Sequence, residues 1–152
     1  MSSYEADILW ERGSQVFSDG RYSRGHDWRF DGGTVVPASS SPHVVRPPYA
    51  VVAAVDPEEA FVAALSSCHM LFFLHLAQRR GLVVDRYRDQ AIGHMEKNAA
   101  GRMAMTRVVL RPEIAFAGGD PPADLVAALH HESHELCFIA NSVTTEVTVE
   151  GQ

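Results

Sequence analysis

The longest apolar region of the chain predicts one helix, from about Asp56 to Arg80. Asp56 is a favourable N-cap, Pro57 suits the first helical position, and the two glutamates that follow complement the positive end of the helix dipole. Two arginines and Gly81 then give a C-terminal stop signal. Between these ends, apolar side chains lie on nearly every side of the predicted helix, which is typical of a buried helix. In a small protein, such a helix is expected to have a sheet on one side and a second subunit on the other.

Apolar and polar residues alternate in several shorter stretches, which predicts strands. An Asp-Gly-Gly turn at 31–33 joins two of them and indicates a β-hairpin, while Pro112 favours an edge or a bulge in a later one. A second helix is predicted over 122–137. The predicted fold class is α+β, with two helices on an antiparallel sheet in a single domain, 1–152. The predicted strands cover residues 4–12, 26–30, 34–38, 83–96, 104–117 and 143–149, and a Ser- and Pro-rich loop covers 39–55.

Composition narrows the classes of function. The chain has 152 residues and a formal net charge of −6, which argues against a nucleic-acid surface because such a surface needs a basic face. No uninterrupted apolar stretch reaches the roughly 18 residues of a membrane span, and the N-terminus lacks the pattern of a signal peptide. We therefore expect a cytoplasmic protein without membrane contact. In that compartment a pair of cysteines is more often catalytic, redox-sensing or metal-binding than a structural disulfide.

The chain has two cysteines, Cys68 in the first predicted helix and Cys137 in the second. A thiolate is the reactive form of cysteine, and apolar surroundings disfavour it. A reactive Cys68 would need a cation from elsewhere in the fold, and with Lys97 as the sole lysine the cation must be an arginine. The alternative is that both are inert buried cysteines. The arginines in predicted loops are Arg21, Arg24 and Arg46.

Glu58 is the carboxylate best suited to orient such an arginine. It precedes Cys68 by ten residues on one predicted helix, hence by about 15 Å along the axis. Glu58 cannot reach the Cys68 of its own chain, so a site that combines them would draw on two subunits. The alternative is a surface glutamate that complements the helix dipole.

Histidines suggest a second chemistry. His130, His134 and Cys137 fall at i, i+4 and i+7 of the second predicted helix, with His131 adjacent. Two histidines at i, i+4 can bind a transition metal, and the cysteine could add a third ligand. Histidines that are simply part of a half-exposed helix give the same pattern.

Three segments together resemble the OsmC/Ohr family, the osmotically inducible and organic hydroperoxide resistance proteins. Asp-Pro-Glu-Glu-Ala-Phe at 56–61 leads into a helix of small residues that contains Cys68, and Gly-Leu-Val-Val follows at 81–84. His134-x-x-Cys137 precedes an Asn-Ser turn and a Thr/Val strand. Departures from the family pattern are Phe138, where a proline often follows the second cysteine, and the histidines, among them His26 and His69.

The resemblance implies an OsmC-like fold in an intertwined homodimer whose two central helices lie between antiparallel sheets. It implies a thiol-dependent peroxidase for organic hydroperoxides, without a metal or cofactor, that defends against oxidative stress. Cys68 would be the peroxidatic thiol and Cys137 the resolving thiol, with Glu58 and Arg24, or Arg21 in its place, supplied by the opposite subunit. The implied reductant is a dithiol such as a lipoyl protein. A non-catalytic member that binds a small apolar ligand is the alternative within the family.

Overall fold

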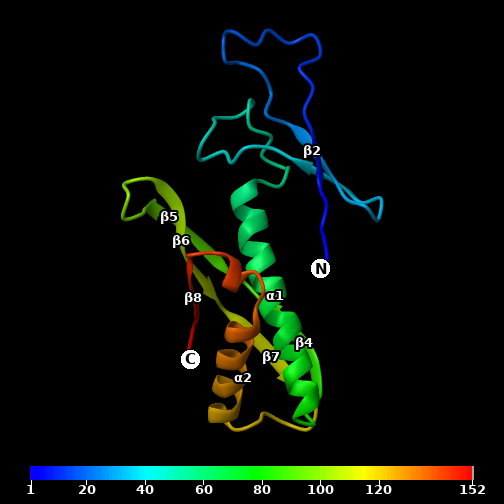
Figure 1. The fold of residues 1–152 in the computed structure, drawn as a ribbon, viewed down its shortest axis with the longest axis vertical. Helices are drawn as coiled ribbons and strands as arrows, with labels where there is room; N and C mark the ends of the chain where they lie inside the picture. The colour runs from blue at the N-terminus through cyan, green and yellow to red at the C-terminus, as the bar shows by residue number, and fades with distance from the viewer. Residues whose placement is uncertain (152) are drawn as a thin grey trace. The chain divides into compact units, whose positions relative to one another are not determined.

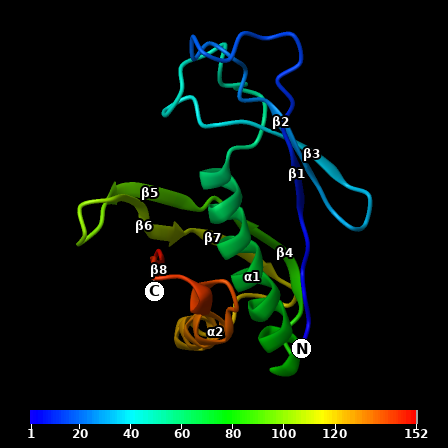
Figure 2. The same ribbon diagram turned by 45° about the horizontal axis from the view of Figure 1, so that its top comes forward.

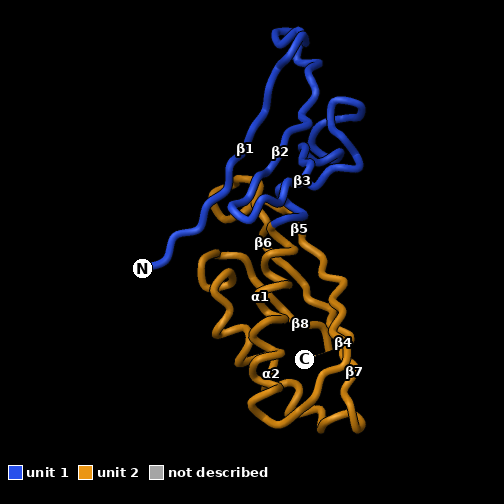
Figure 3. The backbone as a smooth tube through the Cα atoms, turned by 90° about the vertical axis from the view of Figure 1, so that its right-hand side faces the viewer, with its two compact units in different colours: residues 1–60 blue, residues 61–152 orange. Residues whose placement is uncertain are grey.

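The computed structural model describes residues 1–151 and divides into two compact units, residues 1–60 and residues 61 onward (Figure 3). The first helix begins in one unit and continues through the other.

The first unit is built on a three-stranded antiparallel sheet in the order β1-β2-β3. Its β2–β3 hairpin matches the Asp-Gly-Gly turn prediction, and Gly33 takes the positive φ of 89° that the turn requires. The first strand is shorter than the predicted 4–12. The loop over 39–55 returns to the sheet, since the Val55 N–H donates to the Pro37 carbonyl and the Ser39 N–H to the Val55 carbonyl. The strands are β1 (Asp7–Leu9), β2 (His26–Arg29) and β3 (Val35–Ala38).

Helix α1 (Pro57–Arg79) begins with a capping box that the sequence encodes. The Glu59 N–H donates to Asp56 Oδ1 at 2.8 Å, and the Asp56 N–H donates to Glu59 Oε2 at 3.1 Å. Two helix N–H groups that would otherwise lack partners are thereby satisfied. At the other end Gly81 takes a φ of 74°, as the stop signal predicts. The prediction for this helix is confirmed.

The apolar character of helix α1 contradicts the expectation about membrane spans. An 18-residue window of it has a mean hydropathy of 1.7, so by length and composition alone it could cross a membrane. The expectation that no stretch is long and apolar enough is therefore wrong. The same composition is found in central helices of globular folds, which also lie in apolar surroundings. Only 28% of that window is buried within the single chain.

The two long strands predicted over 83–96 and 104–117 are each broken in the middle. The outer halves pair as β4 with β7 and the inner halves as β5 with β6, all antiparallel. Arg111 separates β6 from β7, next to the Pro112 that predicted an irregularity. The break between β6 and β7 coincides with this proline, which cannot donate to the ladder. The bounds are β4 (Val84–Asp89), β5 (Ile92–Lys97), β6 (Met103–Leu110) and β7 (Pro112–Phe116).

The last strand differs from the prediction of a purely antiparallel sheet. β8 (Glu146–Val149) pairs with β6 in parallel. Between them the chain forms helix α2 (Ala123–Leu136) and the short 3₁₀ helix η1 (Ala140–Ser142), which return it in the original direction (Figure 1). Parallel neighbours need such a crossover.

The second unit has two apolar clusters against α1, and α2 lies beside the C-terminal half of this helix (Figure 1 and Figure 2). One joins Phe73 and Leu76 of α1 to Leu129 of α2 and to β4 and β7. The other joins Leu65 of α1 to Val108 and Leu110 of β6 and to β8. At Gly93 of β5 an added Cβ would overlap the side chains of Val62 and Met105. The strand therefore approaches the helix as closely as its backbone allows.

Candidate active site

The two cysteines meet where α1 passes the end of α2. Cys68 is half-buried on α1, and Cys137 is 1% exposed and caps the C-terminus of α2. Cys137 thus lies one residue beyond the helix in which the sequence placed it, with extended backbone angles of φ −62° and ψ 110°. Both are free thiols, and the Cys68 thiol lies near enough to the Cys137 thiol to raise its pKa. The fold brings together two groups that are 69 positions apart in the sequence.

The surroundings of Cys137 keep it protonated in the resting protein. Burial raises the pKa of its thiol, and the neighbouring Cys68 raises it further. The backbone N–H groups of Ala140, 3.4 Å from Sγ, and of Ile139 act in the opposite direction and lower this pKa. A thiol held by backbone donors and kept from water is suited to act second, after an event at the more exposed Cys68.

A pair of buried imidazoles joins α1 to α2, and one of them, His69, directly follows Cys68 in the sequence. His69 and His130 are 1% and 2% exposed, and His69 Nε2 is 3.0 Å from His130 Nδ1. Burial lowers the pKa of each histidine to about 4; for His69, repulsion from His130 and His134 adds to this, and Asp89 partly opposes it. Both rings are therefore neutral at neutral pH, so one donates the shared hydrogen bond and the other accepts it. His69 Nδ1 is buried and has no hydrogen-bond partner among the described residues.

Asp89, at the end of β4, ties the strand break to α1. Its Oδ2 accepts from the Ser66 hydroxyl at 2.5 Å and its Oδ1 accepts from the Arg111 N–H at 2.6 Å. Burial and this carboxylate together raise the pKa of Tyr87, two residues earlier on the strand, well above its ordinary value. Asp89 thus fixes α1 against the sheet at Ser66, which is two residues before Cys68. Sequence reasoning missed this contact because the partners lie 23 positions apart.

Glu58 and Arg24 belong to the first unit, and the cysteines belong to the second. Glu58 is half-buried, and its Oε2 is buried without a hydrogen-bond partner in the part of the chain described. The neighbouring Glu59 forms the helix cap, so the carboxylate of Glu58 is not engaged there. On α1 it precedes Cys68 by ten residues, about 15 Å of helical rise, as expected from the sequence.

Arg24 is held by its own loop. Its guanidinium carbon lies 3.8 Å from the centroid of the Tyr22 ring, and Nη1 donates to the Gly20 and Tyr22 carbonyls. Arg21, the other candidate, is exposed, and its backbone N–H donates to Asp19. Arg24 therefore has the more ordered guanidinium of the two.

The alternative of a metal site at His130, His134 and Cys137 is not supported by the structure. Within residues 1–151, no group of three or more His, Cys, Asp or Glu side chains is close enough to hold a metal ion. His130 is bonded to His69, and Cys137 lies past the end of α2 beside Cys68. His131 is exposed and pairs with Glu135 at 3.4 Å. One helix face in the sequence therefore does not become one ligand set in the fold.

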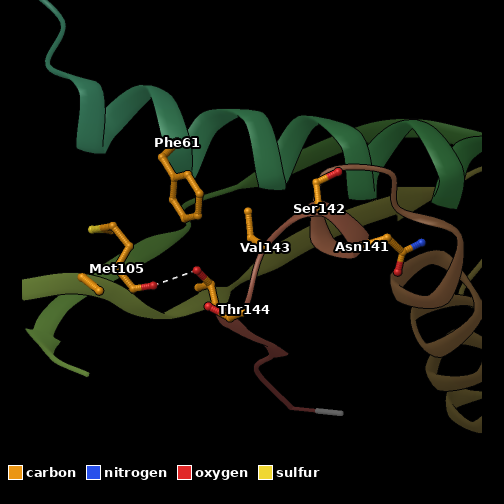
Figure 4. Close-up of a pocket in the computed structure, with 8 residues that line it drawn as sticks. Phe61, Met105, Asn141, Ser142, Val143 and Thr144 are labelled. Carbon is orange, nitrogen blue, oxygen red and sulfur yellow. Dashed lines mark hydrogen bonds between the residues drawn. The ribbon is translucent and has the colours of Figure 1, made fainter. Parts of the chain in front are cut away.

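An open groove of ≈ 620 Å³ lies in the second unit, between the start of α1 and the segment before β8. Figure 4 shows Phe61 directed from α1 toward Val143, with Met105 of β6 alongside. Phe61 is seven residues before Cys68, two turns along the helix, and Asn141 is four after Cys137. The groove is thus bounded by segments that also carry the two thiols.

Fold and site define the class: an α+β protein whose two cysteines lie where the middle of one central helix passes the C-terminal end of a second helix. The family model described as OsmC-like protein matches residues 52–151. The chain belongs to the OsmC family. No curated protein matches it.

Solved structures agree with this assignment. An OsmC-like protein of unknown function from Vibrio cholerae is 52% identical, with a TM-score of 0.96 over 99% of both chains. An organic hydroperoxide resistance protein from Elizabethkingia anophelis is 14% identical, with a TM-score of 0.71 over 100% of this chain and 98% of that one. A putative organic hydroperoxide resistance protein from Vibrio cholerae, with captopril in one of its active sites, is 18% identical, with a TM-score of 0.69 over 100% and 95%. The last two share the fold.

Proposed function

We propose that this OsmC-family protein is a thiol-dependent peroxidase that reduces lipophilic organic hydroperoxides to alcohols. The observation that carries the proposal is the contact between the Cys68 and Cys137 thiols, which a two-cysteine mechanism requires. Membership of the family and the names of two structural relatives support it.

The different surroundings of Cys68 and Cys137 indicate which thiol reacts with peroxide and which one forms the disulfide with it. Cys68, the more exposed thiol, attacks the terminal peroxide oxygen as its thiolate; the O–O bond breaks and the hydroxyl stays on Cys68 as a sulfenic acid. The alkoxide takes up the proton that the thiol released and leaves as the alcohol. The buried Cys137 then attacks the Cys68 sulfur, the S–O bond breaks, and water leaves with the thiol proton. An external dithiol, which we propose to be a protein-bound lipoyl group, reduces the disulfide by exchange.

The assignment of Arg24 and Glu58 requires a second subunit. Arg24 holds the Cys68 thiolate and Glu58 orients the guanidinium, both from the partner of a homodimer, because Glu58 is about 15 Å from Cys68 along α1. The exposure of α1 in the single chain supports this dimer: Leu71 is 60% exposed, and only 28% of the apolar 18-residue window of the helix is buried. We place this activity in the cytoplasm.

A single-turnover reaction tests the proposal. Reduced protein mixed with an equivalent of cumene hydroperoxide should lose both thiols and two mass units, the signature of one internal disulfide. Cys137→Ser should still react once and leave a sulfenate on Cys68, whereas Cys68→Ser should not react. Retention of both thiols by the native protein in excess hydroperoxide would refute the peroxidase function.

The groove beside Phe61 favours a second candidate, binding of a small apolar ligand without chemistry. In that case the thiols stay inert and an alkyl or aromatic ligand binds equally well to native protein and to Cys68→Ser. Parallel calorimetric titration of these two proteins with cumyl alcohol separates the candidates, because only the peroxidase also consumes the hydroperoxide.

A further inference from the structure

The pair His69–His130 is a buried polar contact between α1 and α2, which are also tied by the exposed ion pair of Arg80, just after α1, with Glu132 at 3.1 Å. The rings are nearly parallel, at 11°, with centroids 5.3 Å apart, and the Phe73 ring packs on His130 with centroids at 4.5 Å. Phe73 belongs to the apolar cluster that includes Leu129, the neighbour of His130. Two aliphatic side chains would fill this space without leaving His69 Nδ1 unpaired. The hydrogen bond contributes what aliphatic packing does not, a fixed distance and direction between the helices.

The position of the pair links it to the thiols. His69 directly follows Cys68, so a contact that fixes His69 also fixes the backbone of Cys68. On α2, His130 precedes Cys137 by seven residues, which is two turns and about 10 Å of rise. Over that length, a swing of α2 by about 10° moves Cys137 by about 2 Å, nearly the whole range of Cα separations that a disulfide tolerates.

The thiol of Cys137 moves with α2 as one body. Its backbone N–H donates to the His134 carbonyl at 3.3 Å, and its Sγ accepts from the Ala140 N–H at 3.4 Å. The Asn141 side chain also donates to the Glu135 carbonyl at 3.0 Å. The orientation of α2 on α1 therefore decides where the sulfur of Cys137 lies.

We propose that His69 and His130 are positioning residues that hold α2 in the orientation in which Cys137 reaches Cys68, so that they control disulfide formation and not the attack on peroxide. The proposal deepens the peroxidase function and rests on it for its biological meaning. The relative position of the two thiols can itself be measured without any reaction with peroxide. The charged and titratable groups that face His69 are His130 and His134 of α2 and Asp89 of β4.

The test compares substitutions that keep the hydrogen bond with ones that remove it. Glutamine at position 69 places an amide near Nε2 and asparagine at 130 places one near Nδ1, so His69→Gln and His130→Asn can keep the bond. His69→Asn and His130→Phe cannot, because asparagine is too short to reach from position 69 and phenylalanine lacks the polar atom. His131→Phe is the matched control, one position away with an exposed side chain.

The first measurement is the equilibrium of each reduced protein with mixtures of reduced and oxidised dithiothreitol, which gives the effective concentration of the two thiols. We expect His69→Asn and His130→Phe to lower it by about tenfold or more, and the bond-keeping variants and the control to stay within about threefold of native. Equal values for His69→Gln and His69→Asn would overturn the proposal. Because both are small polar substitutions, this pair decides even if His130→Phe does not fold.

The second measurement separates positioning from a general structural effect. In a Cys137→Ser background, each variant should oxidise Cys68 with cumene hydroperoxide at the native rate. With Cys137 present, the bond-removing variants should accumulate sulfenate and then sulfinate, seen as a gain of 32 mass units. A parallel fall in the Cys68 oxidation rate would also overturn the proposal. If the native protein does not react with hydroperoxide, the peroxidase function fails, and the dithiothreitol equilibrium still decides the role of the pair.

Discussion

Acid should destabilise this protein through the His69–His130 pair. Burial lowers the pKa of each imidazole to about 4 from an ordinary value of 6.5. Between these values the unfolded chain binds protons that the folded chain does not. The contribution of the pair to stability is therefore complete above pH 6.5, falls as the pH drops from 6.5 toward 4, and changes no further below that.

The size of the effect follows from the same two values. At pH 5 an unfolded histidine is 1.5 units below its ordinary pKa of 6.5, while the folded one is still mostly neutral. At about 1.4 kcal/mol per unit, each histidine then removes about 2 kcal/mol from the free energy of unfolding relative to pH 7.5. Repulsion from His130 is one cause of the shift at His69, so the two values overlap and the pair removes less than twice that amount.

Urea unfolding followed by far-UV circular dichroism at pH 7.5 and 5.0, at constant ionic strength and protein concentration, measures this difference. The double variant His69→Gln/His130→Asn keeps two polar groups that do not titrate, and it should lose about 2 kcal/mol less than the native protein on acidification. Carboxylates titrate in both proteins and cancel. His131→Gln should behave as native. A double variant with the native pH dependence would refute the reasoning.

Five further substitutions test three other parts of the structure. Glu59→Ala removes the capping box and should cost about 1 kcal/mol of stability, with little effect on peroxide turnover. Glu58→Gln should slow peroxide turnover with little effect on stability. Urea unfolding measures the first effect and a hydroperoxide assay the second. Gly93→Ala should cost about 1–3 kcal/mol by the overlap described above, while Gly32→Ala, with open space around it, should be within about 0.5 kcal/mol of native by thermal unfolding. Leu71→Asp should convert the proposed dimer to a monomer in sedimentation velocity, and a native dimer in that variant would contradict the assignment of this helix face.

Local signals in the sequence were sufficient for most of the fold. The capping residues and Gly81 define α1 almost to the residue, and the Asp-Gly-Gly turn defines the β2–β3 hairpin. Pairing direction was not predictable for β8, because alternation of apolar residues says which side chains share a face and not which strand lies beside them. The direction depends on the crossover through α2, a property of the tertiary structure.

The candidate site, like the fold, could be predicted only in part. The position of Cys68 on α1 was evident from its helix, but its contact with Cys137 was an expectation from the family resemblance. The imidazole pair was missed, since His69 and His130 are 61 positions apart and each taken singly suggests a core residue or a metal ligand. The spacing along one helix left metal binding open as an alternative for His130, whereas packing between two helices gives that side chain a hydrogen-bond partner.

The apolar character of α1 also bears on how the chain emerges from the ribosome. The helix ends at Arg79, and the 57 residues from Arg80 to Leu136 must be made before α2 is complete. At about 5–20 residues per second, a helix as apolar as a membrane span waits roughly 3–11 s for the segment that packs against it. During that interval the nascent chain presents the kind of surface that chaperones and membrane-targeting factors bind. Efficient production of this protein therefore depends on protection of α1 during translation as well as on the stability of the finished fold.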